Sequence, residues 1–141
     1  MLAILNSPVW GAGHTGVVQV SATVAATVQH AILQQETRLL VTPEHIARGY
    51  VDAPLGTVLA VKSNDVNGYF LAVSIDSLVV REASLSINGR VVGVPFGGGL
   101  IHQDFAGRDT QTVRITYRLW LSPTVQPGSY QWPVMVEASP L

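Results

Sequence analysis

Apolar and polar residues alternate strictly near the end of this 141-residue chain, and this pattern constrains the fold more than any other feature. The apolar members of the run are Val113, Ile115, Tyr117, Leu119 and Leu121. Successive side chains of a β-strand point to opposite faces, so a period of two predicts a strand with one buried face. Helical periodicity is nearly absent from the rest of the chain, so we expect a structure built of strands.

A second alternation follows a turn rich in proline and glycine at residues 122–128. Its apolar face comprises Tyr130, Trp132, Val134, Val136 and Ala138. A strand this apolar suits the interior of a sheet, although Pro133 cannot donate to a ladder and favours an edge or a bulge. The sequence supplies no later strand, so we expect something else to cover the far edge of this one.

The N-terminal part of the chain carries the longest alternation, over residues 18–29. Small apolar side chains occupy its even-numbered positions, namely Val18, Val20, Ala22, Val24, Ala26 and Val28. The run exceeds the usual ~5–6 residues of a strand, so it forms either one long strand that serves two neighbours or two strands. We interpret residues 1–16 as an N-terminal extension or the remnant of a signal peptide, and residues 17–141 as one β-sandwich domain.

Turn signals divide the middle of the chain into short segments. Residues 39–41, 57–61 and 69–75 are predicted strands, and residues 44–47 a single helical turn. An extended segment that begins at Tyr50 is expected to stop at Pro54.

Two further predictions concern turns and connections. Asn88-Gly89, flanked by apolar residues, predicts a β-hairpin with a type I′ turn. Residues 96–109 are expected to form a long flexible connection. Many short strands separated by turns predict an all-β sandwich or barrel. Gly128-Ser129-Tyr130 suits a tyrosine corner of the immunoglobulin type, in which the hydroxyl bonds back to the chain.

The composition favours a chain that associates with other proteins. Charged residues make up 12% of the sequence, about half the usual ~25%, while 48% are apolar and the net charge is −1. So little charge protects a monomer poorly against association. The sequence lacks a basic cluster, so nucleic acid is not an expected partner. No apolar run approaches the ~18 residues of a membrane span, and the absence of cysteine excludes disulfides.

Residues suited to catalysis or metal binding are sparse. The histidines are His14, His30, His45 and His102, and they share no close metal-ligand spacing. Gly97-Gly98-Gly99 is followed by neither a nucleophile elbow nor a phosphate-binding lysine. The pair Asp104 and Asp109 is better explained as part of a solvated loop than as an acid–base pair or a calcium loop. We therefore expect no enzyme activity, no metal and no cofactor.

Three stretches together resemble the bacterial pilus subunits of the chaperone–usher class, and most closely the archaic branch with its spore-coat-U-like pilins. They are residues 18–28, residues 56–64 and the ending over residues 117–136. The resemblance implies an immunoglobulin-like sandwich that lacks its last strand and is completed by donor-strand exchange. The donor strand would be Val18, Val20, Ala22 and Val24 of a neighbouring copy, and the acceptor edge would be Tyr130, Trp132, Val134 and Val136.

The same resemblance implies the partners and the location of the chain. The partners are copies of itself or related pilins, a periplasmic chaperone and an outer-membrane usher. The subunit would pass through the periplasm and end in an extracellular fimbrium. Two other classes stay open: an adhesin-like or carbohydrate-binding module that uses Trp120 or residues 96–108, and a small enzyme or metal carrier that uses the histidines.

Overall fold

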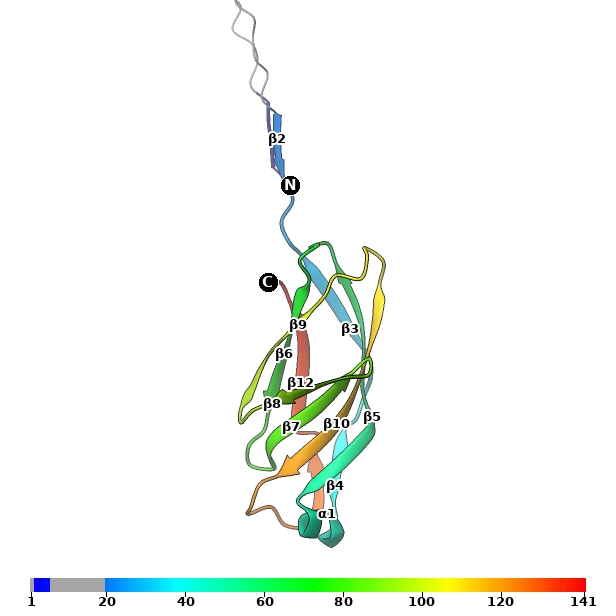
Figure 1. The fold of residues 1–141 in the computed structure, drawn as a ribbon, viewed down its shortest axis with the longest axis vertical. Helices are drawn as coiled ribbons and strands as arrows, with labels where there is room; N and C mark the ends of the chain where they lie inside the picture. The colour runs from blue at the N-terminus through cyan, green and yellow to red at the C-terminus, as the bar shows by residue number, and fades with distance from the viewer. Residues whose placement is uncertain (1, 6–19) are drawn as a thin grey trace, which may run out of the picture.

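Strands make up most of the computed structural model, which describes residues 2–5 and 20–141 (Figure 1). Its elements in chain order are β1 (Leu2–Leu5), β2 (Val20–Thr23), β3 (Val28–Gln35), β4 (Arg38–Val41), α1 (Pro43–Arg48), β5 (Tyr50–Ser63), β6 (Tyr69–Ile75), β7 (Val80–Ile87), β8 (Arg90–Val94), β9 (Gly98–Gln103), β10 (Gln111–Leu121), β11 (Gly128–Gln131) and β12 (Val134–Ser139). The predicted all-β class is confirmed. No helix among these residues is long and apolar enough to cross a membrane.

Two antiparallel sheets form the layers of the domain. The larger has the order β3-β5-β10-β7-β8, and the smaller has the order β12-β6-β9. A short ladder joins β4 to β11, and β1 pairs with β2 apart from the other strands (Figure 1). The inner faces of both sheets meet in one core, which agrees with a β-sandwich.

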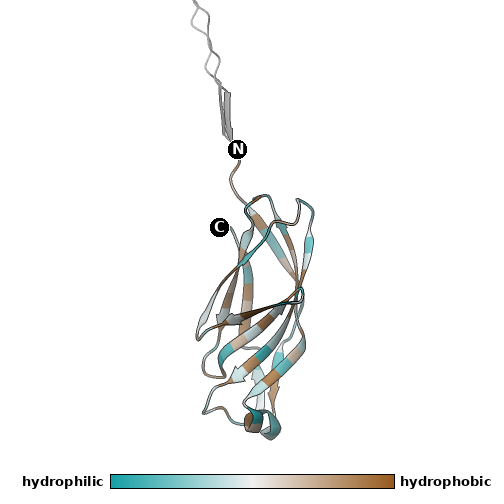
Figure 2. Cartoon of the chain, in the orientation of Figure 1, coloured by the Kyte–Doolittle hydropathy of each residue, from teal (hydrophilic) through white to brown (hydrophobic). Residues whose placement is uncertain are grey.

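The core follows the alternation of the sequence. Along β10 the five predicted inward residues are all buried, and Leu119 has no exposed surface. Leu59, Leu71 and Leu85 fill the core from three other strands, each with no exposed surface. Figure 2 shows hydrophobic and hydrophilic residues alternating along these strands. The prediction that residues 113–121 form a strand with one buried face is confirmed.

The predicted turns are also found. Asn88 and Gly89 adopt φ angles of 49° and 90° between β7 and β8, as the type I′ turn requires. The predicted helical turn is α1, which Thr42 caps and Gly49 ends at a φ of 88°. The Tyr130 hydroxyl donates a 2.6 Å hydrogen bond to the Gln126 carbonyl, so it does bond back to the chain.

Two predictions about chain breaks are wrong. Pro54 does not end a strand, because β5 continues through a bulge opposite Ile115 and Tyr117, where the register shifts. Within this bulge a Cβ on Gly56 would lie 2.0 Å from the Ile115 carbonyl oxygen, so only glycine fits. Residues 96–109 are not one long connection, because β9 lies within them and pairs with β6. Gly98 allows that pairing, since a Cβ there would lie 2.0 Å from the Val73 carbonyl oxygen.

The two apolar alternations at the ends of the domain are each divided. In the described part of residues 18–29, β2 ends at Thr23 and β3 begins at Val28, so the reading as two strands holds. The alternation over residues 130–138 is not one strand, because it changes sheets at Trp132 and Pro133. Its first part, β11, pairs with β4, and its second part, β12, pairs with β6 at the edge of the smaller sheet.

Candidate functional site: an open seam between two edge strands

Two chain segments border one side of the sandwich, and we call the line between them the seam. One segment contains β3 and β4, and the other contains β11 and β12. In the closed half of the seam, next to α1, β4 pairs with β11 (Figure 1). In the open half, β3 and β12 belong to different sheets and form no ladder with each other.

The closed half is held by backbone and side-chain contacts. Four residue pairs form its ladder, from Gly128 with Val41 to Gln131 with Arg38. The Trp132 N–H then donates to the Thr37 carbonyl at 3.0 Å. Two residues that β4 turns inward, Leu39 and Val41, are 3% and 1% exposed. Pairing therefore covers the core completely here.

A chain of side-chain hydrogen bonds marks the junction between the two halves. With its amide oriented to satisfy its neighbours, Gln35 accepts from Trp132 Nε1 at 2.7 Å and donates to Thr57 Oγ1 at 2.9 Å. Thr57 Oγ1 lies 2.6 Å from the Tyr117 hydroxyl, and the Tyr117 ring packs edge-on against Trp132. Burial raises the pKa of Tyr117 to about 12, although the Thr57 hydrogen bond opposes this rise.

Along both edges of the open half, part of the backbone has no partner in the portion of the chain that the structure describes. The Asp76 N–H donates to the Pro133 carbonyl, so Pro133 and Asp76 form a hydrogen-bonded pair of the β12–β6 ladder. Hydrogen-bonded pairs recur at every second residue of an antiparallel ladder, so the amides of residues 135 and 137 also point toward β6. The amides of Val134, Val136 and Ala138 are then directed away from β6. By the same rule the amides of Val28, His30 and Ile32 are directed away from β5. None of these six amides has a backbone partner among the described residues.

A core-facing side chain of β3 is uncovered between these edges. Ile32 lies opposite Leu59 of β5, which is on the core face of the larger sheet and fully buried. Ile32 shares that face but is 55% exposed. A groove of about 510 Å³ lies here, bordered by His30 and Ile32 on one side and by Val134 and Val136 on the other. A strand lying in the groove would cover Ile32 and meet unpaired backbone on both sides.

The predicted acceptor residues fall on two different strands. Val134 and Val136 lie on β12, inward-facing and buried, beside the open half. Trp132 lies at the junction, partly buried against the core. Tyr130 lies on β11 in the closed half, where Leu39 of β4 is already its partner. The acceptor role of these four residues stays a prediction.

The predicted donor residues lie away from the seam. Val18 is outside the described residues. Val20 and Ala22 belong to β2, which pairs with β1 from Leu5 to Leu2 and joins neither sheet of the sandwich. Val24 follows in a link and is 67% exposed. Within the described chain, no segment of the N-terminal run fills the groove, and the donor role also stays a prediction.

One side chain fixes where this link meets the sandwich. Asn64 Nδ2 donates to the Ala25 carbonyl at 3.0 Å, and Asn64 Oδ1 accepts from the Thr27 N–H at 2.8 Å. Ala25 and Thr27 are therefore held on the domain, and a separate donor strand can consist only of residues that precede Ala25.

Sequence reasoning missed most of β3, because the predicted alternation ended at Gln29 and residues 30–35 were given no strand. Half of its residues are polar, and the apolar run Ala31-Ile32-Leu33 breaks the alternation. Every residue of β3 from Gln29 to Gln34 is exposed. The only available signal was the continuation of the even-numbered face through Val28, His30 and Ile32.

The outward Trp120 is engaged within its own chain. Its ring packs edge-on against Tyr50 at 5.1 Å, and the Arg48 and Arg118 guanidiniums lie over the Tyr50 ring at 4.6 and 4.2 Å. Arg118 also binds Asp52 through two hydrogen bonds, and this contact lowers the pKa of the Asp52 carboxyl. These contacts occupy part of the two aromatic rings, which disfavours their use as a surface for stacking a sugar.

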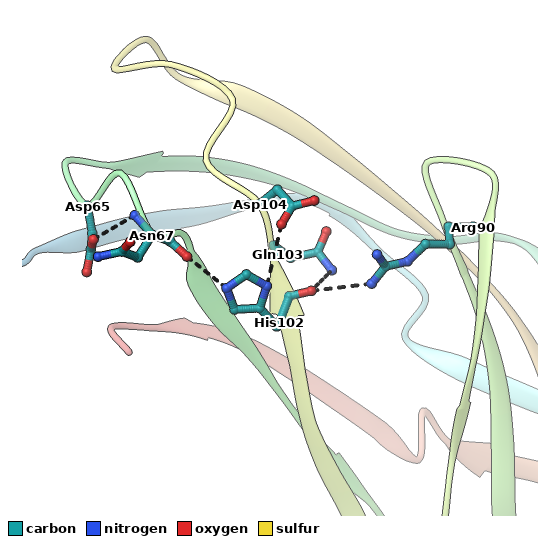
Figure 3. Close-up of polar contacts among 6 residues, drawn as sticks. All are labelled: Asp65, Asn67, Arg90, His102, Gln103 and Asp104. Atoms are coloured by element: carbon teal, nitrogen blue, oxygen red, sulfur yellow. Dashed lines mark hydrogen bonds and ion pairs between the residues drawn. The ribbon is translucent and has the colours of Figure 1, made fainter.

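The histidines outside the seam make local contacts. His102 Nε2 lies 2.8 Å from the Asn67 carbonyl, and its Nδ1 lies 3.6 Å from Asp104, so the ring ties a turn to β9 (Figure 3). His45 Nδ1 accepts from the Thr42 N–H as part of the cap of α1. His14 lies outside the described residues. Among the residues described, no three His, Asp or Glu side chains gather to hold a metal ion.

Comparison with known proteins gives no further guide to this site. No family model, no curated protein and no solved structure matches the chain.

Proposed function

We propose that this protein is a structural subunit of a bacterial surface pilus that polymerises by N-terminal donor-strand complementation. The observation that carries the proposal is Ile32, which faces the core yet is 55% exposed, between two edges whose outward amides have no backbone partner within residues 2–5 and 20–141. In this proposal the domain is an immunoglobulin-like sandwich without its last strand, and the groove is the place of that strand. Such a subunit needs no catalytic residue, and we propose no enzyme activity.

The proposed occupant of the groove is the N-terminal run of a neighbouring copy. Val18, Val20, Ala22 and Val24 would face the core, and the polar residues between them would face solvent. A strand in the groove uses both of its edges, whereas β1 pairs with one edge of β2. Donation by β2 therefore requires that β1 separate from it.

The physical gain comes from the two features of the open half. A docked strand would bond to unpaired backbone on β12 and on β3, which supplies affinity in strand addition. It would also bury the exposed part of Ile32 under its own apolar face, worth about 1 kcal/mol for roughly half a side chain. The alternate inward side chains then set specificity.

The remaining partners rest on the resemblance to chaperone–usher pilins. Before assembly a periplasmic chaperone would cover the same groove, because an exposed edge with apolar residues invites aggregation. An outer-membrane usher would pass the subunit to the surface, so the final location is an extracellular fimbrium.

The test compares two substitutions one residue apart. Val20→Asp should abolish polymerisation, because an unpaired carboxylate buried against the core costs several kcal/mol. Gln19→Asp should be tolerated, because the next residue of a strand points to the other face. Polymer formation is followed by size-exclusion chromatography and electron microscopy, with the melting temperature as a check on folding.

Equal loss of polymer in both variants would contradict the donor-strand proposal. So would a structure of the polymer in which the N-terminal run pairs only within its own chain.

A further inference from the structure

His30 is the titratable side chain on the core face of β3. In the β3–β5 ladder it lies opposite Val61, which is 1% exposed, so its side chain is on the inner side of the sheet. Val28 and Ile32 flank it on the same face. His30 also borders the groove of the open half, together with Val134 and Val136 of β12.

The His30 side chain is exposed to solvent and has no polar partner among the described residues. The groove also has three charged residues along it: Glu36 and Arg38 from the connection between β3 and β4 and the start of β4, and Glu137 from β12. None of the ion pairs or side-chain hydrogen bonds among the described residues involves His30. Val61, Val134 and Val136 are apolar and offer the imidazole no partner.

We propose that His30 makes filling of the groove depend on protonation, so that the donor strand of a second copy binds to the neutral imidazole and is released as His30 becomes charged. This inference rests on the proposed function and adds to it that pH controls the binding of the donor strand. A donor strand replaces the water around His30 with apolar side chains, because Val18, Val20, Ala22 and Val24 carry no hydrogen-bond acceptor. A neutral ring tolerates that change far better than an imidazolium does.

The size of the effect follows from linkage. Histidine side chains titrate near pH 6.5, so almost all are neutral at about pH 7.5 and roughly nine-tenths are charged at about pH 5.5. If the filled groove admits only the neutral ring, the affinity for the donor strand falls about tenfold between these two pH values. Two carboxylates border the groove, Glu36 before β4 and Glu137 on β12, and either would offset this loss by pairing with the charged ring.

The experiment measures binding of a labelled peptide of residues 17–25 by fluorescence anisotropy. The acceptor is the full chain with Val20→Asp, which retains its own groove and cannot donate. We expect the peptide affinity to fall about tenfold from about pH 7.5 to about pH 5.5. Adding His30→Leu should reduce that fall to less than about twofold, whereas His102→Gln on β9 should leave it unchanged.

A tenfold fall that persists in the His30→Leu chain would overturn the inference, and so would a wild-type groove with no pH dependence. Glu137→Gln tests whether this carboxylate compensates for the charge: exclusion of the charged ring already gives the largest possible fall, so the fall should stay about tenfold, and a smaller fall would contradict the inference. Absence of peptide binding at both pH values would instead overturn the proposed function, because no donor strand would then fit the groove.

Discussion

The two halves of the seam are built from the same two chain segments, but the core-facing side chains of β4 are buried in the closed half and Ile32 of β3 is exposed in the open half. In the closed half Leu39 faces the core from β4 and is 3% exposed, because β11 pairs beside it. In the open half Ile32 faces the core from β3 and is 55% exposed, because β12 lies in the other sheet. Both positions carry an apolar side chain, so the difference lies in what covers them.

This contrast shows what the open half lacks. A single ladder is enough to cover Leu39, and the ladder ends where Trp132 bonds to Thr37. Beyond that point the groove separates β3 from β12, and each presents amides without a partner among the described residues. An additional strand would give the open half the cover that the closed half already has.

The largest difference between the two halves is expected in the stability lost when a core-facing side chain is truncated. In the isolated subunit, Leu39→Ala should lower the free energy of unfolding by about 2–5 kcal/mol, as large-to-small changes in a core do. Ile32→Ala should cost less than about 1 kcal/mol, because the side chain is already largely exposed. Urea denaturation of chains that also carry Val20→Asp provides the measurement. Similar losses at both positions would show that the open half is covered without a partner.

Alkaline pH should weaken the junction of the two halves. The pKa of Tyr117 is raised from an ordinary value of about 10 to about 12 by burial, so its neutral form is favoured in the folded state. Stability is then fully present below about pH 10 and declines by up to about 2–3 kcal/mol as pH rises through about 12.

The control for this prediction is Tyr117→Phe. Tyr69, whose pKa burial also raises, remains in that variant, so the loss of stability at high pH should become shallower rather than vanish. Thermal unfolding at several alkaline pH values measures both chains. An unchanged pH dependence in Tyr117→Phe would contradict the account.

The smallest effect is expected at the surface of the closed half. Arg38 donates to the hydroxyl and the carbonyl of Ser129 across the β4–β11 ladder, in an exposed setting. Arg38→Ala should cost about 0.5–1 kcal/mol, because water replaces exposed hydrogen bonds at little cost. Denaturation with urea should show no change in the m-value, since the ladder itself remains. A loss above about 2 kcal/mol would mean that side chains, rather than backbone pairing, hold this half closed.

The sequence predicts the parts of this fold whose cause is local. Strict alternation identifies β10, and Asn88-Gly89 identifies the β7–β8 hairpin, because each pattern has one structural solution. The short helix α1 is likewise predicted locally, because Pro43 and Gly49 mark its two ends. For the candidate site, the apolar face of β12 was visible in the sequence.

The rest depends on contacts distant in sequence. Pro54 was expected to end a strand, but its place in a bulge depends on the register with β10. The change of sheet at Pro133 depends on β4, which lies about ninety residues earlier. Most of β3 was missed because His30 interrupts the apolar residues of its inward face and Leu33 breaks the alternation. The groove is therefore a property of two segments together and not of either pattern alone.

Hydrogen exchange at the amides of β12 tests the central claim most directly. In the isolated subunit the amides of Val136 and Ala138, which are directed into the groove, should exchange almost as fast as in an unfolded chain. The amides of Met135 and Glu137, directed toward β6, should be slow in every state and serve as internal controls. In the polymer the exchange of Val136 and Ala138 should slow by at least about a hundredfold, equivalent to an opening free energy of about 3 kcal/mol. Unchanged fast exchange at Val136 and Ala138 in the polymer would contradict the claim that a strand from another copy fills the seam.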